Sequence, residues 1–386
     1  MDGARKVANT ESANLIQYFE NVPGVAKIAH GYNPATWMLE CIGAGVGSAG
    51  PGPAVTNFVD CFKKSEMKGV LDESMARKGV THPSPEFPEL LFSSKFAADN
   101  ATQMKFLVSR FLDMYWRSPS YNLTRIVIGI VLALIFGVIF SGADYTTYQG
   151  VNSGVGMIFM TTLFNGMVSF NSVLPIASEE RAAFYREQAS QMYRPFWYFI
   201  GSTVAEIPYV FLSTAGFTLV FYPLVGFTGF GNAVLYWITS SLLVLLMAYT
   251  GQFLVYAMPS LAVAATMGVL LTSVQSLFMG FNPPAEAIPK VYKWIYYATP
   301  QRYALANLVS IVFSSCPSPE SDAFGCQQLR KAPLALGNIT VKAYTEKVFG
   351  MKESEIAMNF GVLIAFIVFF RVLALLSLCY LNHQKR

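Results

Sequence analysis

The stretch Ile126–Phe140, IVIGIVLALIFGVIF, contains only apolar residues and glycine, and it decides the class of the fold. With residues 122–125 before it and 141–142 after it, the run reaches the roughly 20 residues that an α-helix needs to cross a bilayer. Backbone amides find no water in hydrocarbon, so a spanning segment must pair them internally as a helix. The segment also lacks the alternating pattern of a barrel strand. We therefore predict a membrane-spanning helix over residues 122–142.

Five further apolar runs follow along the chain. They predict spanning helices over residues 151–177, 196–222, 233–258, 261–281 and 358–381. The chain is 53% hydrophobic and only 13% charged, whereas soluble domains average roughly 25% charged residues. This composition excludes a disordered chain and leaves too few polar residues to cover a soluble globule. We expect an all-α membrane protein with six transmembrane helices.

The positions of Lys and Arg predict which helix ends face the cytosol. Short cytosolic loops are enriched in these residues, while long loops cross the membrane largely regardless of charge. The short loops at residues 143–150 and 226–232 contain neither Lys nor Arg, so they are expected outside. The loop at residues 178–195 holds three arginines and is expected in the cytosol, together with both termini. The long segment at residues 282–357 is then extracellular. Met1–Phe19 lacks the apolar core of a signal peptide.

Two features of residues 282–357 suit an extracellular, oxidising location. Cys316 and Cys326 lie ten residues apart, and a disulfide is expected between them, the alternative being two free thiols. Asn338 begins a glycosylation sequon. The sequons at Asn100 and Asn122 fall on the cytosolic side or at the membrane edge and are expected to be unused. The remaining cysteines are expected to stay reduced: Cys41, Cys61 and Cys379.

A second apolar stretch lies within this extracellular segment, from Ile288 to Phe313. Pro289, Pro300 and Arg302 interrupt it, and its Tyr and Trp residues are typical of a membrane interface. We expect short re-entrant or surface helices here, the alternative being a seventh and an eighth span.

Known enzyme motifs are nearly absent. The chain has no phosphate loop of the form G-x-x-x-x-G-K-[ST], no H-E-x-x-H and no G-x-S-x-G. Gly45–Gly50 matches G-x-G-x-x-G, but no strand pattern precedes it and Pro51 follows, so a flexible linker is expected. The three histidines are scattered and give no reason to expect a metal. A net charge of +4 gives no reason to expect nucleic acid.

Two charged segments on the cytosolic side are predicted to bind a surface. Residues 102–118 place apolar side chains at helical spacing between polar ones, which indicates an amphipathic helix on the membrane face. An ordinary packed helix is the alternative. Residues 179–187, EERAAFYRE, combine mixed charges with a central Phe184-Tyr185 pair. This pattern favours docking onto a cytosolic partner over a merely solvated loop.

Two charged residues fall inside predicted spans. Glu206 lies ten residues into the span that begins at Phe196. Arg371 lies ten residues before the end of the last span at Leu381. At 1.5 Å per residue, both are roughly 15 Å from the cytosolic side. Because an unpaired charge in a bilayer is costly, we expect Glu206 and Arg371 to interact directly or through a polar relay. The alternative is an Arg371 side chain that reaches the head groups.

The motifs around these segments resemble a known family. Glu180-Arg181-x-x-Phe184-Tyr185-Arg186-Glu187, followed by Glu206-Ile207-Pro208-Tyr209, resembles the transmembrane domain of G-subfamily ATP-binding-cassette (ABC) exporters. Leu15–Glu20, Val22–Val25 and Gly31–Glu40 resemble the end of the second nucleotide-binding domain in full-size pleiotropic-drug-resistance transporters. Leu381-Asn382-His383 and the basic tail fit the same family, so the resemblance covers residues 11–386.

Members of this family have two nucleotide-binding and two transmembrane domains, and the chain resembles only the last quarter to third of one. The resemblance implies a nucleotide-binding-domain tail (1–42), a cytosolic linker (43–100), an amphipathic connecting helix (101–119) and an ABC-2 type transmembrane domain (120–386). The phosphate loop, signature and catalytic Glu of the second nucleotide-binding domain are missing. We therefore expect no catalytic residue and no cofactor in this chain, and ATP and Mg²⁺ in the parent transporter.

The resemblance also implies roles for individual residues. The coupling helix, which receives motion from the ATPase domains, corresponds to Glu179, Glu180, Arg181, Phe184, Tyr185, Arg186 and Glu187. A substrate cavity is implied at Asn165, Val168, Ser273 and Ser276, plain helix packing being the alternative. An extracellular gate is implied at Gly280, Phe281 and Asn282. The family has apolar residues at its gate positions, and Asn282 departs from this pattern.

We therefore expect the transmembrane half of an ATP-driven exporter of amphiphilic small molecules or lipids, located in the plasma membrane. Its expected partners are membrane lipid, nucleotide-binding domains, a second transmembrane domain and a hydrophobic substrate. The two kinds of domain would lie in the same polypeptide or in a partner chain. The alternative is a non-transporting membrane module that binds or regulates a related transporter. An enzyme is not expected. A membrane enzyme needs catalytic groups, such as an acid and a base, at the same depth in the membrane, and apart from Glu206 and Arg371 the sequence predicts none.

Overall fold

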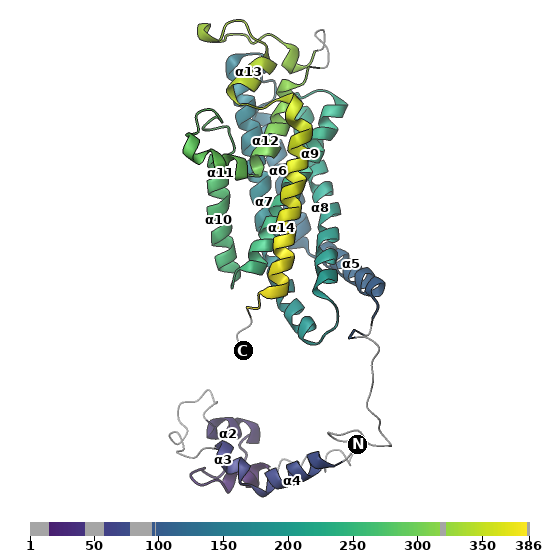
Figure 1. Ribbon diagram of the computed structural model, residues 1–386, viewed down its shortest axis with the longest axis vertical. Helices are drawn as coiled ribbons and strands as arrows, with labels where there is room; N and C mark the ends of the chain where they lie inside the picture. Colours follow the sequence, from purple (N-terminus) through teal and green to yellow (C-terminus); the bar gives the residue numbers. More distant parts are fainter. Residues whose placement is uncertain (1–14, 43–57, 78–94, 97, 317–321, 384–386) are drawn as a thin grey trace. The chain divides into compact units, whose positions relative to one another are not determined.

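The computed structural model describes residues 15–42, 58–77, 95–96, 98–316 and 322–383 (Figure 1). The chain divides into two compact units, with the boundary between Ser93 and Ser94. The G-x-G-x-x-G stretch Gly45–Gly50 lies outside the described residues.

The first unit is built from short helices that share aromatic contacts. Its described helices include α2 (Pro34–Cys41), α3 (Phe58–Lys63) and α4 (Glu66–Ala76). The ring of Phe19 lies 6.2 Å from the ring of Trp37 and 6.0 Å from that of Phe58. Two helices, α3 and α4, therefore form within the stretch that was expected to be a linker, and α3 packs its aromatic rings against the segment before it.

The second unit is a helix bundle. Its helices are α5 (Asn100–Arg117), α6 (Pro119–Ile139), α7 (Tyr148–Ala189), α8 (Pro195–Leu224), α9 (Phe230–Ala257), α10 (Leu261–Leu277), α11 (Lys293–Ala298), α12 (Gln301–Val309), α13 (Val341–Val348) and α14 (Ile356–Tyr380). Within the described residues, five helices are long and apolar enough to cross a membrane, namely α6, α7, α8, α9 and α14. The predicted class, an all-α membrane protein, is confirmed.

The helix at the fifth predicted span is shorter than the prediction of residues 261–281. α10 has 17 residues, which at 1.5 Å per residue is about 25 Å and falls short of the roughly 30 Å of a hydrocarbon core. The helix cannot continue because Gly280 adopts a left-handed φ of +90° and two prolines follow at 283 and 284. Six spans therefore remain a prediction.

The apolar stretch from Ile288 to Phe313 forms short helices. α11 has six residues and α12 has nine, with Thr299-Pro300 between them. Neither helix has the length that a bilayer crossing requires.

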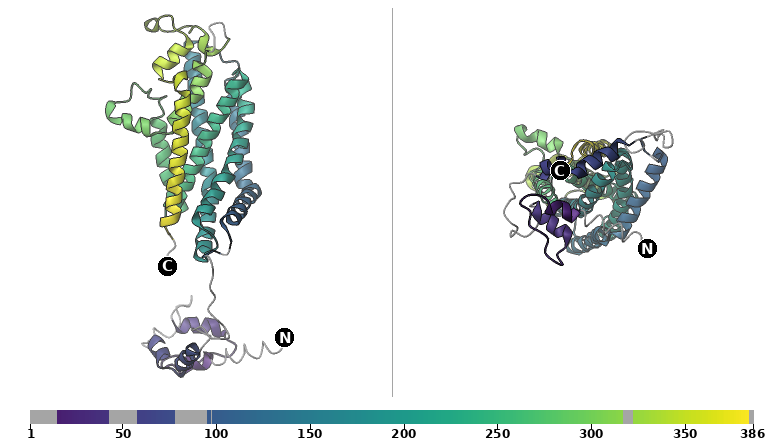
Figure 2. Two further views of the ribbon diagram at one scale, coloured as in Figure 1. Left: turned by 45° about the vertical axis from the view of Figure 1, so that its right-hand side comes forward. Right: turned by 90° about the horizontal axis from the view of Figure 1, so that it is seen from below.

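α9 lies at the centre of the bundle. Of its most apolar segment, 67% is buried, compared with 22% for α6 and 28% for α14. The yellow helix in Figure 2, α14, runs along the outside of the bundle. α5 and the end of α14 lie at one end of the bundle, and α13 lies at the opposite end (Figure 1). One hydrophobic cluster fills each end, and the polar groups described below lie in the cluster nearer α5.

Candidate functional site

The predicted coupling segment is the end of a long helix. α7 runs unbroken over 42 residues, so residues 179–187 form its last turns and continue the helix that begins at Tyr148. Most of the connection predicted at residues 178–195 is helical: residues 178–189 still belong to α7, and only residues 190–194 lie outside helices. The reason is local, because Glu, Arg, Ala and Gln are good helix formers and dominate residues 179–189.

The aromatic pair of this segment faces inward. Phe184 is fully buried and Tyr185 is 6% exposed. The Phe184 ring lies 4.6 Å from the ring of Tyr198 on α8, and the Tyr185 hydroxyl donates to the carbonyl of Leu381 (3.2 Å). The expectation that this pair docks onto a partner is therefore corrected, since both rings pack inside their own chain. The exposed residues of these turns are Glu179, Ala182, Arg186 and Ala189, which form one outward stripe at helical spacing.

α5 is tied to the end of α7 by ion pairs. Arg110 donates to Glu187 at 2.7 and 2.9 Å and to Glu180 at 2.7 Å. The Tyr193 hydroxyl donates to the same Glu187 carboxylate at 2.5 Å. Burial alone would lower the pKa of Arg110, but the hydrogen bond to Glu187 and both carboxylate charges outweigh it and raise the pKa. We call Arg110, Glu180 and Glu187 the α5–α7 clamp.

α5 has one packed face and one open face. Its buried side chains, Gln103, Leu107, Phe111 and Tyr115, recur at a spacing of four. They lie against α8, where a Cβ at Gly201 would approach Phe111 to 2.9 Å, so only glycine permits this contact. Phe106 and Trp116 are 67% and 75% exposed on the other side. The helix thus combines the two alternatives read from the sequence, because it packs on α8 and also presents large apolar groups outward.

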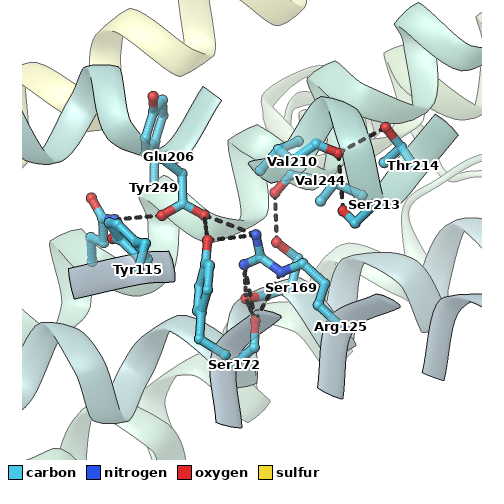
Figure 3. A network of polar contacts seen from close by, with 12 residues as sticks. Tyr115, Arg125, Ser169, Ser172, Glu206, Val210, Ser213, Thr214, Val244 and Tyr249 are labelled. Atoms are coloured by element: carbon cyan, nitrogen blue, oxygen red, sulfur yellow. Dashed lines mark hydrogen bonds and ion pairs between the residues drawn. The ribbon is translucent and has the colours of Figure 1, made fainter. Parts of the chain in front are cut away.

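A buried ion pair lies inside the bundle (Figure 3). Glu206 on α8 is fully buried, and Arg125 on α6 is 4% exposed. Arg125 Nη1 donates to Glu206 Oε1 at 2.9 Å. The same guanidinium reaches Ser172 Oγ (2.9 Å) and the Ser169 carbonyl (3.3 Å) on α7. The Tyr121 hydroxyl also donates to Glu206.

Glu206 and Arg371 do not touch, and Gln252 of α9 lies between them. Gln252 Nε2 donates to Glu206 Oε2 at 3.2 Å, while Arg371 Nη1 donates to Gln252 Oε1. Arg371 Nη2 donates to the Phe199 carbonyl at 3.1 Å, and its guanidinium lies 4.4 Å from the rings of Phe199 and Tyr249. Arg371 is 4% exposed, so its side chain stays inside the bundle.

We call Arg125, Glu206, Gln252 and Arg371 the Glu206 network. It joins α6, α8, α9 and α14 and contains two cations and one anion. Arg125 directly precedes the apolar run Ile126–Phe140, and its role was not predicted from the sequence. The available signal was its position six residues inside a helix that Pro119 begins, which puts it at membrane depth rather than before the helix.

The four predicted cavity residues lie on two neighbouring helices. Asn165 and Val168 are half-buried on α7, whereas on α10 Ser276 is half-buried and Ser273 is exposed. Ser276 Oγ donates to the Ser273 carbonyl at 2.8 Å, which is a bond within the helix. The structure therefore places the two pairs on adjacent helices and leaves the predicted cavity itself untested.

The predicted gate residues follow α10. Phe281 stacks on Phe159 of α7, with ring centroids 5.0 Å apart, and on Phe349 at 6.1 Å. Gly156 allows this approach, because a Cβ there would come within 3.0 Å of the Phe281 ring. Asn282 is exposed, so the polar residue lies beside the aromatic stack and not within it. Phe281 also borders a cavity of about 590 Å³ lined mainly by α6 and α7.

The segment between α12 and α14 carries the disulfide and the sequon. Cys316 and Cys326 are joined, with their Cα atoms 5.1 Å apart. Asn338 is exposed, and Thr340 of its sequon caps α13 by accepting from the amide of Ala343 (3.2 Å). The three other cysteines are free thiols: Cys41, Cys61 and Cys379. The other two sequon asparagines are engaged by Trp197, which donates to Asn100, and by the Tyr115 carbonyl, which accepts from Asn122.

Comparison with known proteins adds the family. Residues 102–313 match the ABC-2 type transporter family, and residues 320–386 match the family of CDR ABC transporters. ABC transporter G family member 36 of Oryza sativa subsp. indica is 31% identical over 97% of this chain and 24% of its own length. ABC transporter G family member 33 of Arabidopsis thaliana is 32% identical over 97% of this chain and 26% of its own length. Pleiotropic drug resistance protein 1 of Nicotiana tabacum is 30% identical over 97% of this chain and 25% of its own length. The chain spans about a quarter of the length of these relatives.

The first match extends from α5 to the segment after α12, so it contains the α5–α7 clamp and three of the four residues of the Glu206 network. Arg371 falls within the second match. The resemblance read from EERAAFYRE and from Glu206–Tyr209 is confirmed. The chain belongs to the ABC-2 type transporter family.

Proposed function

We propose that the chain forms the transmembrane half of an ATP-driven exporter of amphiphilic small molecules or lipids. The observation that carries this proposal is the continuity of α7. One helix extends from the Phe281 stack to the charged turns that α5 clamps, so a displacement at one end reaches the other. The similarity to G-family and pleiotropic-drug-resistance proteins supports export as the activity.

The chain's own residues would transmit the motion of the ATPase domains to the membrane helices. The outward stripe of Glu179, Ala182 and Arg186 would contact ATPase domains at the cytosolic side. The clamp through Arg110 would pass the motion to α5 and from there to α8, against which α5 packs. The Glu206 network would keep four helices moving together. A tilt of α7 would separate Phe159 from Phe281 and open the outer end.

The remaining components are proposed from the family. The nucleotide-binding domains and a second transmembrane domain would lie in the same polypeptide or in a partner chain. ATP and Mg²⁺ would be held by those nucleotide-binding domains, since this sequence has no phosphate loop. A hydrophobic substrate would bind near Asn165, Val168, Ser273 and Ser276 and leave past Gly280, Phe281 and Asn282. Both termini would face the cytosol at the plasma membrane.

The α5–α7 clamp is expected to be required for transport. Arg110→Glu places a third carboxylate beside Glu180 and Glu187 and should reduce export of rhodamine 6G about tenfold, because bonds to charged groups are among the strongest polar contacts. The measurement is ATP-dependent dye export by proteoliposomes that contain the transporter together with its nucleotide-binding domains. The export rate is normalised to the amount of protein. Exchanging the charges, as Arg110→Glu with Glu187→Arg, should restore part of the rate.

Lys105→Glu is the matched control, because it makes the same charge change on an exposed position of α5. It should leave export near the wild-type rate. Equal export by the Arg110→Glu and Lys105→Glu proteins would exclude the clamp as a coupling element. Failure of the wild-type protein to export any amphiphilic dye would favour the non-transporting module.

A further inference from the structure

Arg302, at the start of α12, is surrounded by tyrosine rings. Its guanidinium carbon lies 4.0 Å from the ring centroid of Tyr296, 4.3 Å from that of Tyr303 and 4.9 Å from that of Tyr297. Aromatic rings attract a cation through their negative faces, and this attraction fixes the position of the guanidinium. The Tyr303 hydroxyl donates to the Tyr297 carbonyl at 3.0 Å and holds two walls of this cage together.

The cage does not satisfy the hydrogen-bond donors of Arg302. Its Nε and Nη1 atoms are buried without a hydrogen-bond partner. Among the described residues it forms no ion pair, and Glu355, whose charge acts on Tyr296, is paired with Lys352 at 3.2 Å. A cation is also unfavourable at a helix N-terminus, where the helix dipole is positive. Buried donors without partners are rare in native proteins, so the positive charge of Arg302 is left without a counter-charge in this cage.

The surroundings of the cage suit a membrane surface. Tyr292, Trp294 and Tyr297 are 51%, 68% and 56% exposed, and such residues gather at the level of lipid head groups. Lys290 is exposed and Lys293 is half-buried on the same segment. The segment therefore presents aromatic rings beside several positive charges.

We propose that Arg302 and its tyrosine cage bind the phosphate group of a membrane lipid. The cation-π contacts hold the guanidinium in place. Its third nitrogen, Nη2, is not among the buried atoms, so Nη2 would be the one that donates to a phosphate oxygen. The exposed aromatic rings would lie along the lipid's glycerol and upper acyl chains. This site is separate from the proposed transport cavity and does not depend on transport.

The cage also adjoins the gate. A Cβ at Gly280 would come within 2.9 Å of the Tyr296 ring, so one wall of the cage lies directly against the first gate residue. A lipid held on Arg302 would therefore contact the outer end of the bundle beside Phe281.

The test is native mass spectrometry of the full chain in detergent, with phosphatidic acid and diacylglycerol of identical acyl chains as probes. These lipids differ only in the phosphate group. The wild-type protein should retain phosphatidic acid about tenfold more strongly, as expected for a charge-assisted hydrogen bond. Arg302→Gln should abolish this preference, and Arg302→Lys should keep part of it. Equal retention of the two lipids by the wild-type protein would overturn the proposal, and this result does not depend on any variant folding.

Arg330→Gln is the matched control. Arg330 lies in the same long segment between α10 and α14, but its side chain is 64% exposed and paired with Asp144 at 2.9 Å. Its replacement should leave the preference for phosphatidic acid unchanged. Two results would show that the lipid phosphate does not bind at Arg302. One is a preference for phosphatidic acid that survives in the folded Arg302→Gln protein, and the other is an equal loss of this preference in the Arg302→Gln and Arg330→Gln proteins. Displacement of the lipid by equimolar inorganic phosphate would show a small-anion site and overturn the assignment to a lipid.

Discussion

Arg125→Met is expected to lower the free energy of unfolding by about 3–5 kcal/mol, because it leaves the buried carboxylate of Glu206 without its cation. Removing one partner of a buried pair leaves an uncompensated charge, and the Glu206 side chain has no exposed surface. The double variant Arg125→Met with Glu206→Met should recover much of the loss, since well-packed apolar residues can replace a buried pair at little cost. Thermal unfolding in detergent measures both effects.

Arg330→Met provides the comparison for this prediction. It removes a guanidinium from an ion pair of the same length, 2.9 Å, whose side chains are 64% and 50% exposed. Such exposed pairs contribute about 0–1 kcal/mol. If the Arg125 and Arg330 variants unfold at the same temperature, the Glu206 network does not stabilise the bundle.

Phe184→Ala is expected to cost about 3–5 kcal/mol, the range found for removing a fully buried ring. Phe184 has no exposed surface and contacts Tyr185, Tyr193 and Tyr198, with ring centroids 4.6–6.4 Å away. Its loss would leave a cavity where α7, α8 and the loop between them meet. The measurement is again the shift in thermal unfolding.

Phe230→Ala is the matched control for Phe184, because this ring at the start of α9 is 87% exposed. Its replacement should change the stability by less than about 0.5 kcal/mol. A Phe184→Ala protein as stable as the Phe230→Ala protein would show that the aromatic pair does face outward, as the sequence alone suggested.

The positions of the long helices could be predicted from the sequence because hydrocarbon leaves the backbone few choices. The apolar runs at 196–222, 233–258 and 358–381 each fall within two or three residues of α8, α9 and α14. The end of α7 could not be predicted in this way. Charge at residues 179–187 indicates that they leave the membrane, but it does not tell whether the helix stops there.

Polar partners inside the bundle were harder to predict than the helices. The depth of Glu206 and Arg371 shows that each needs a partner. Which residue supplies it depends on how helices rotate and pack, and sequence position does not reveal that. Arg125 and Gln252 come from two other helices and complete the network. The prediction that Phe184 docks onto a partner was wrong for a related reason. An aromatic residue between charged residues can face a neighbouring helix as readily as a partner protein.

The central claim is that the end of α7 receives motion from ATPase domains, and site-specific photocrosslinking tests it most directly. A photoreactive amino acid at Ala182, in the centre of the outward stripe, would be activated in intact cells, with the same residue at exposed Leu219 of α8 as the control. We expect Ala182 to crosslink to a nucleotide-binding domain with a phosphate loop, identified by mass spectrometry, and Leu219 to crosslink to lipid. Crosslinks from Ala182 that reach only lipid or α5 would contradict the account.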